Sequence, residues 1–194
     1  MSSRLIVNSI RHTGASSDAI TLDSAGKVAF PNTSTGKILQ VKNYTRTDTV
    51  SEQITGYGIG SSDVLTLSLT AASTSNRLLF IIDVNVSVQD VNESCGIVLH
   101  SGGSVISTAT GDAASNRSRI TSGGFIGIEN SAFTNIGMNY YHTPANTNAT
   151  TYQVRFYNGD ADTRYMYANR AHVDTDTAGF ARTISSMTIL EVAA

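Results

Sequence analysis

The sequence predicts an all-β protein: an antiparallel β-sandwich or jelly roll preceded by a short N-terminal β arm, assembled as a trimer. Two observations predict the sandwich. Apolar and polar residues alternate with a period of two along most of the chain, which places one side of each strand in a core and the other in solvent. Clusters of Ser, Asn, Gly and Asp separate these segments and have the composition of turns.

Seven or more strands are expected between residues 37 and 194, a number typical of a sandwich or jelly roll. Residues 64–70 alternate leucine with hydroxyl side chains, and residues 82–89 alternate Ile or Val with Asp, Asn, Ser and Gln. No window repeats apolar residues convincingly at helical spacing, and residues 71–75 and 112–115 are the only stretches compatible with a short turn of helix. The other predicted strands are 38–41, 96–99, 124–128, 152–157 and 187–192.

Residues 1–36 are predicted to be a separate attachment or trimerisation arm, and residues 37–194 the β-sandwich head domain. Two short apolar segments, 19–22 and 27–30, are separated by a turn sequence at 23–26, and Pro31 opens a predicted hinge. Two or three short strands do not bury their apolar faces alone. The same segment from other copies is the expected partner, and an arm lying back on its own head domain is the alternative.

The composition argues against several classes of partner. Charged residues make up 14% of the chain, against ~25% in typical domains, and the net charge is −2. No basic stripe predicts nucleic-acid binding, and no apolar run is long enough for membrane insertion. No secretory signal is visible, so a soluble protein made in a cytoplasm is expected. The single cysteine, Cys95, excludes an internal disulfide and is predicted to lie in the core.

Several segments resemble the fibre-like virion structural proteins of marine bacteriophages, of the tail-fibre or knob type. Residues 169–192 contain Asn-Arg, then Asp-Thr-Asp, then a closing Ser-Ser-Met-Thr-Ile-Leu-Glu strand. The Gly-Asp-Ala-Ala loop at 111–114 and the Ser-Thr-Ser approach to a long strand at 73–75 agree, although Ala71 stands where Pro is common. Residues 6–10, Gly14 and residues 20–22 are similar to the short N-terminal strands of such proteins.

This resemblance implies a trimeric virion fibre or knob with a jelly-roll-like head. It implies no enzymatic activity, no cofactor and no defined ligand residues. The expected location is the virion, with synthesis in the host cytoplasm. The expected partners are further copies of the chain, other virion proteins bound through the arm, and a host-surface glycan or protein.

Motifs for catalysis or metal binding are weak. The four histidines are far apart in the sequence and each is expected on the surface or in a turn. No Gly-x-Ser-x-Gly elbow occurs, and residues 56–60 lack the end of a phosphate loop and are interpreted as a strand or turn. No catalytic, cofactor-binding or metal-binding residue is therefore predicted. Two pairs of carboxylates occur, Asp160 with Asp162 and Asp174 with Asp176. They are interpreted as turn caps, and Ca²⁺ binding is the alternative.

Two clusters of aromatic residues are the candidate receptor or subunit contacts. They place amphipathic rings beside cations and an imidazole, which suits stacking on sugars or filling a protein interface. Burial of alternate rings in the core and in contacts between subunits is the alternative. The candidate residues are Tyr140, Tyr141, His142, Arg164, Tyr165 and Tyr167.

The sequence therefore favours a non-enzymatic bacteriophage structural protein of the tail-fibre or receptor-binding type. A capsid decoration (cement) protein or head fibre is the first alternative, because an extended arm also suits clamping a shell. A cellular lectin-like or C1q-like adhesin is the second. A depolymerase is the least supported reading, since such enzymes commonly need paired acids on a long repetitive scaffold.

Overall fold

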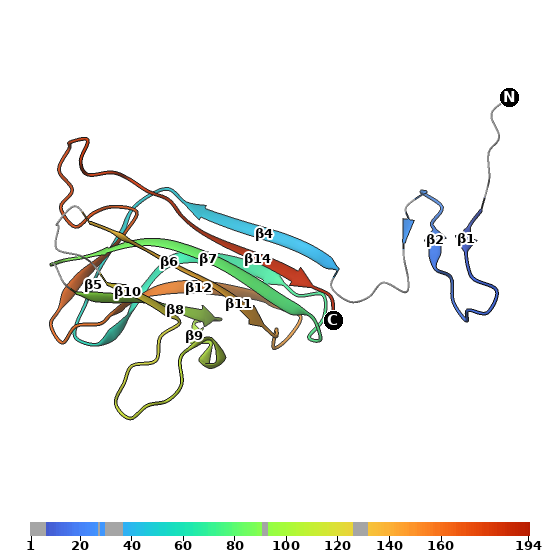
Figure 1. The fold of residues 1–194 in the computed structure, drawn as a ribbon, viewed down its shortest axis with the longest axis horizontal. Coiled ribbons are helices and arrows are strands. Elements are labelled where there is room, and N and C mark those ends of the chain that lie inside the picture. The colour runs from blue at the N-terminus through green and yellow to red at the C-terminus, as the bar shows by residue number, and fades with distance from the viewer. Residues whose placement is uncertain (1–6, 27, 30–36, 91–92, 126–131) are drawn as a thin grey trace.

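The computed structural model describes residues 7–26, 28–29, 37–90, 93–125 and 132–194. Every strand pairing in these residues is antiparallel, and their one helical element is a 3₁₀ turn at Ser107–Ala109. The predicted all-β sandwich is confirmed. Figure 1 shows two sheets packed face to face, with a small third sheet apart from them.

The first layer is a six-stranded sheet built around the long strand β7. Strand β11 pairs along one edge of β7, while β14 and then β13 pair along the other edge. β4 and β5 lie outside β14 and β13. The strands are β4 (Ile38–Arg46), β5 (Val50–Ile54), β7 (Arg77–Val88), β11 (Thr134–His142), β13 (Arg164–Ala168) and β14 (Ser185–Val192).

The second layer is a five-stranded sheet in the order β10-β8-β12-β6, with β9 paired to β8. From β5 onward the chain crosses between layers at most connections; β8, β9 and β10 stay in one layer, and β13 and β14 stay in the other. Repeated crossing between two antiparallel sheets is typical of a jelly roll. The strands are β6 (Gly58–Thr70), β8 (Ser94–Ser101), β9 (Ser104–Val105), β10 (Ser122–Phe125) and β12 (Ala149–Asn158).

The core lies between the two sheets and follows the predicted alternation. On β7, every second residue from Leu78 to Val88 is buried, because the period of two sends these side chains to one face. Leu65 and Leu69 of β6 are buried opposite them, and Cys95 is 1% exposed, as predicted. The largest buried side chains from both sheets include Phe80, Leu99, Tyr152, Phe156, Met166 and Met187.

The third sheet is the arm, formed by β1 (Ser9–Ile10), β2 (Ile20–Leu22) and β3 (Val28–Ala29). Ile10 lies opposite Ile20, and Leu22 lies opposite Val28. Residues directly opposite in an antiparallel pair, and residues two apart in a strand, share a face, so these four side chains form one apolar face. Ile10 and Val28 on that face are 52% and 49% exposed. The predicted hinge at 31–36 lies outside the described residues.

Residues 71–75 and 112–115 contain no helix, and the 3₁₀ turn lies elsewhere. Residues 58–60 begin the long strand β6, which agrees with the interpretation of residues 56–60 as a strand or turn. One sequence-based prediction is corrected. His100 is only 4% exposed, so the prediction of a surface or turn position was wrong for this histidine.

Candidate functional site

The first predicted aromatic cluster lies on β11, and the pleat separates its members. Tyr141 points outward and is 56% exposed. Tyr140 and His142 point the other way: the Tyr140 hydroxyl lies 2.6 Å from the Thr108 hydroxyl, and the His142 ring packs edge-on against Tyr152. Burial lowers the pKa of His142, because the charged imidazolium is poorly solvated there. Tyr141 is therefore the member of this cluster that presents most of its ring to solvent.

The second cluster lies on β13 and in the segment after it. Tyr165 and Tyr167 face outward and stack at 6.2 Å, and the ring of His172 also stacks with Tyr167, at 5.7 Å. The Arg170 guanidinium lies 4.5 Å from the centre of the Tyr167 ring. Tyr167 is consequently only 8% exposed, and burial raises its pKa. Tyr165 is the more accessible ring of this stack, at 38%.

The two clusters lie near opposite ends of β7. Tyr141 pairs with Leu79, whereas the backbone of Tyr165 bonds to Gln89. Ten residues of extended strand separate Leu79 from Gln89, a distance of about 33 Å at roughly 3.3 Å per residue. The structure therefore does not bring the six candidate residues into one site.

Arg164 lies among carboxylates rather than on an open surface. Its guanidinium is 2.7 Å from Asp160, 3.3 Å from Glu93, 3.4 Å from Asp162 and 3.5 Å from Asp90. Burial and the neighbouring Asp160 raise the pKa of Glu93. Burial also acts to raise the pKa of Asp160, but backbone N–H donors and Arg164 outweigh it and the net shift is downward. Arg164 thus links the β12–β13 turn to the end of β7 and the start of β8.

The predicted alternatives for the two carboxylate pairs can now be placed. Asp160 and Asp162 both face Arg164, and Asp174 faces Arg170 and Arg182. In the described part of the chain, no three His, Cys, Asp or Glu side chains converge as metal ligands. The arrangement of these carboxylates is that of ion-pair partners.

Asn169 anchors the segment between β13 and β14 over one end of the six-stranded sheet. Its backbone has φ 63°, a left-handed conformation that Asn tolerates better than most residues. Its side-chain amide donates to the carbonyls of Arg46 and Asp48 at 3.0 and 2.9 Å and accepts from Ser185 at 2.6 Å. These bonds satisfy a fully buried amide and hold residues 170–184 in place.

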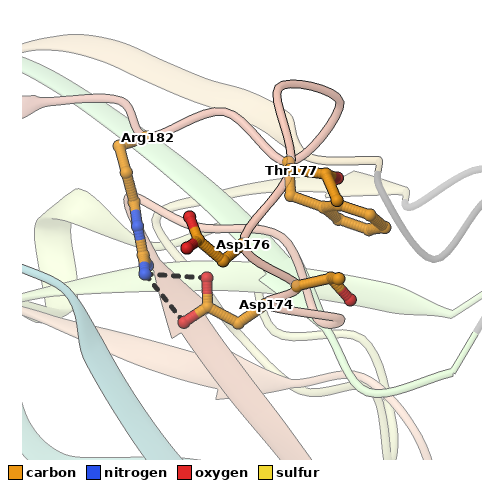
Figure 2. Close-up of a pocket in the computed structure, with 6 residues that line it drawn as sticks. Asp174, Asp176, Thr177 and Arg182 are labelled. Carbon is orange, nitrogen blue, oxygen red and sulfur yellow. Dashed lines mark hydrogen bonds and ion pairs between the residues drawn. The ribbon is translucent and has the colours of Figure 1, made fainter.

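The anchored segment encloses a small polar hollow of about 310 Å³. Figure 2 shows the Arg182 guanidinium bound to both oxygens of Asp174, with Asp176 and Thr177 nearby. Arg170 approaches the same carboxylate at 3.3 Å. Carboxylate, hydroxyl and guanidinium groups make this hollow suited to a small hydroxylated ligand, and its volume lies at the lower end of ligand pockets.

A second hollow of about 280 Å³ lies beside the start of β6 and the loop after the 3₁₀ turn. Tyr57, which is 65% exposed, and Tyr157 contribute rings, while Arg117 contributes an exposed cation. Asn116 and Ser118 add hydrogen-bonding groups. Rings beside amide and guanidinium groups suit a sugar or a peptide side chain. This site was not predicted from the sequence, although Tyr57, a large aromatic residue flanked by Gly56 and Gly58, was a signal for it.

No helix in the described residues is long and apolar enough to cross a membrane. No protein-family model matches the chain, and no curated protein is significantly similar to it. A solved structure with a similar arrangement is that of the infectious bursal disease virus Gx strain, at 13% sequence identity and a TM-score of 0.39. The match covers 90% of this chain and 44% of the viral chain, so the chain spans less than half the length of that protein.

Proposed function

We propose that this chain is a non-enzymatic structural component of a bacteriophage particle, of the tail-fibre or receptor-binding type. The observation that carries the proposal is the combination of a jelly-roll head with a separate three-stranded arm whose apolar face is exposed. A rigid sandwich presents loops and hollows at its surface, which suits binding. An arm with an unburied apolar face suits attachment to further copies and to other virion proteins.

The segments that resemble virion fibre proteins support the proposal through their places in the fold. The closing Ser-Ser-Met-Thr-Ile-Leu-Glu segment is β14, which lies between β4 and β7. Asn169, at the start of the same resemblance, anchors the segment that covers the sheet. The loop that begins at Gly111 leads into the hollow containing Arg117. The resembling segments thus include both structural anchors and a candidate binding surface.

We also propose a trimer held by the arm, with the hollow at Tyr57, Tyr157 and Arg117 as a contact for a host-surface glycan or protein. Tyr141 and Tyr165 are further candidate contacts, since both rings are accessible. Three copies on one particle convert a weak individual contact into strong attachment through avidity. The protein is then made in the host cytoplasm and functions in the virion.

Immunogold electron microscopy of purified particles of the phage that encodes the chain tests this function. Antibodies raised against the recombinant protein should label the tail or its fibres. Label over the capsid would replace the fibre role with that of a decoration protein or head fibre. Particles without label, together with label on the cell surface, would overturn the proposal in favour of a cellular adhesin.

A further inference from the structure

The outer surface of the six-stranded sheet carries an apolar row that crosses four strands. Strand register places Leu190 between Val41 and Leu79, and Tyr141 on the far side of Leu79. Val41 and Tyr141 are 57% and 56% exposed, and Ile81 in the next row is 44% exposed. We call this surface the apolar patch, and its residues are Ile38, Val41, Leu79, Ile81, Tyr141, Leu190 and Val192.

The rest of the outer surface differs from the patch. At the other end of the same sheet, the segment after Asn169 covers outward-facing residues, so that Ser87 is fully buried and donates a hydrogen bond to the Arg170 carbonyl. On the outer face of the five-stranded sheet, the part around Ser68 is polar, and Ser68 bonds Thr151 across the strands. Contiguous apolar surface with a polar border marks an interaction site. The patch therefore has the properties of a surface that binds a partner.

The arm has the matching property. Its one apolar face, formed by Ile10, Ile20, Leu22 and Val28, stays open to solvent within the single chain. Two apolar faces are thus exposed in the same chain, and neither covers the other. A three-stranded sheet also fits the patch in size, since four neighbouring strands span about 14 Å between the outer two at roughly 4.8 Å spacing.

The route of the chain favours this contact. The patch includes Ile38 and Val41 of β4, and β4 is the strand that the arm leads into. Residues 30–36 connect arm and head, and seven residues span at most about 25 Å. The arm leaves its own head at the border of the patch. With this reach, it extends to the patch of a neighbouring head that lies beside the first.

We propose that the apolar face of β1–β3 in one copy docks on the apolar patch of a second copy. The contact is head-to-tail, so each copy gives its arm to the next and receives an arm from the previous one, and a closed ring of three satisfies every patch. This inference rests on the self-assembly in the proposed function and adds the location of the interface. The named residues of the patch and of the arm face are uncharged, in keeping with a contact made by apolar burial, and Arg77, opposite Val192, lies at the border of the patch.

Cross-linking between two variants that each carry one introduced cysteine tests the contact. The native Cys95 is buried and its pKa is raised to about 12 by burial, so it contributes little background reaction. Full-length Ile10→Cys and Ile81→Cys proteins are mixed, allowed to exchange and treated with a short thiol-to-thiol cross-linker. A covalent heterodimer on a denaturing gel is expected, because the two positions belong to different copies.

Matched controls use the opposite faces. Ser9→Cys is the neighbour of Ile10 on the other face of the arm, and Ser68→Cys lies on the outer face of the five-stranded sheet. Mixtures of Ser9→Cys with Ile81→Cys, and of Ile10→Cys with Ser68→Cys, should give at most a tenth of the product. Equal yields in all mixtures would overturn the proposal.

Light scattering of the wild-type protein separates failure of this inference from failure of the proposed assembly. A trimer of three times 20.5 kDa without the specific cross-link would retain self-assembly and overturn the patch as its site. A monomer in which a doubly substituted Ile10→Cys, Ile81→Cys chain links only to itself would overturn both. An Ile81→Asp variant that keeps its circular dichroism but falls to one third of the wild-type mass is the expected supporting result.

Discussion

Glu191 is a fully buried carboxylate near the end of β14. It accepts hydrogen bonds from the Ala72 backbone N–H at 2.7 Å, from Asn76 at 2.6 Å and from Gln40 at 2.5 Å. Burial acts to raise its pKa, but the Asn76 and Gln40 amides and the backbone donors outweigh burial and lower the pKa below the ordinary 4.5. This one side chain therefore ties the end of the central strands to the β6–β7 connection and to β4.

Replacing Glu191 with Gln should lower the free energy of unfolding by about 2 kcal/mol at neutral pH, because hydrogen bonds to a charged group are lost and an NH₂ group faces donors. Since the folded pKa is depressed, the stabilisation by the carboxylate is present above the ordinary pKa of 4.5 and is lost as the pH falls through the folded pKa. Urea unfolding of the wild type and of Glu191→Gln, measured from neutral pH to below pH 4.5, checks the prediction. Exposed Asp112→Asn is the control and should match wild type, whereas a constant difference at all pH values would contradict the prediction.

His142 and His100 add a second pH dependence. Burial lowers the pKa of both below 6.5, so the unfolded chain takes up protons first as the pH falls. The free energy of unfolding should thus decrease as the pH falls from about 7 to 5. His142→Phe should make this pH dependence less steep, while His100 retains part of it. Unfolding in urea at several pH values measures the slope. An unchanged pH dependence in His142→Phe would contradict this prediction. His12→Gln, on the exposed arm, is the control.

At the scale of strands, the sequence predicted those elements in which one face is buried and the other polar. β7 and β12 are examples, because their alternating side chains leave a clear period of two. β5, β11 and β13 were not recognised as strands. β5 lies at a sheet edge and has mostly polar residues, and β13 carries Tyr165 and Tyr167 on one face with Met166 and Ala168 on the other. Where both faces are occupied by similar residues, alternation carries no signal. β11 does alternate apolar or aromatic residues with Asn135, Gly137 and Asn139, so its signal was present in the sequence but was not used.

The candidate binding residues were harder to predict than the strands. Tyr140 and Tyr141 are neighbours in sequence, yet the pleat sends one ring against the core and the other to solvent. Which face of a strand is buried depends on the sheet that packs against it, and a single sequence does not show that sheet. The hollow at Tyr57 and Arg117 joins residues sixty positions apart, so only the fold reveals it.

Arg164 shows how one residue holds elements together. Replacing it with Met leaves Asp90, Glu93, Asp160 and Asp162 without their shared cation, and the repulsion between them should lower the melting temperature by several degrees. Arg182→Met is the matched control: it removes a more exposed guanidinium that pairs with Asp174, and should cost less than half as much. Thermal unfolding by circular dichroism decides, and equal losses would show that Arg164 has no special structural role.

At the scale of the whole molecule, the exposed arm face and the apolar patch link stability to concentration. If folded chains bury these surfaces in one another, mass action stabilises the folded state, and Tm should rise by about 2–4 °C for each tenfold increase in protein concentration. Ile81→Asp should remove this dependence, because a carboxylate in the patch cannot be buried without a large desolvation cost. Ser68→Asp, on the polar outer face of the other sheet, should keep it. Scanning fluorimetry over two decades of concentration measures all three, and a wild-type Tm that is the same at every concentration would mean that the two apolar faces do not meet between copies in solution.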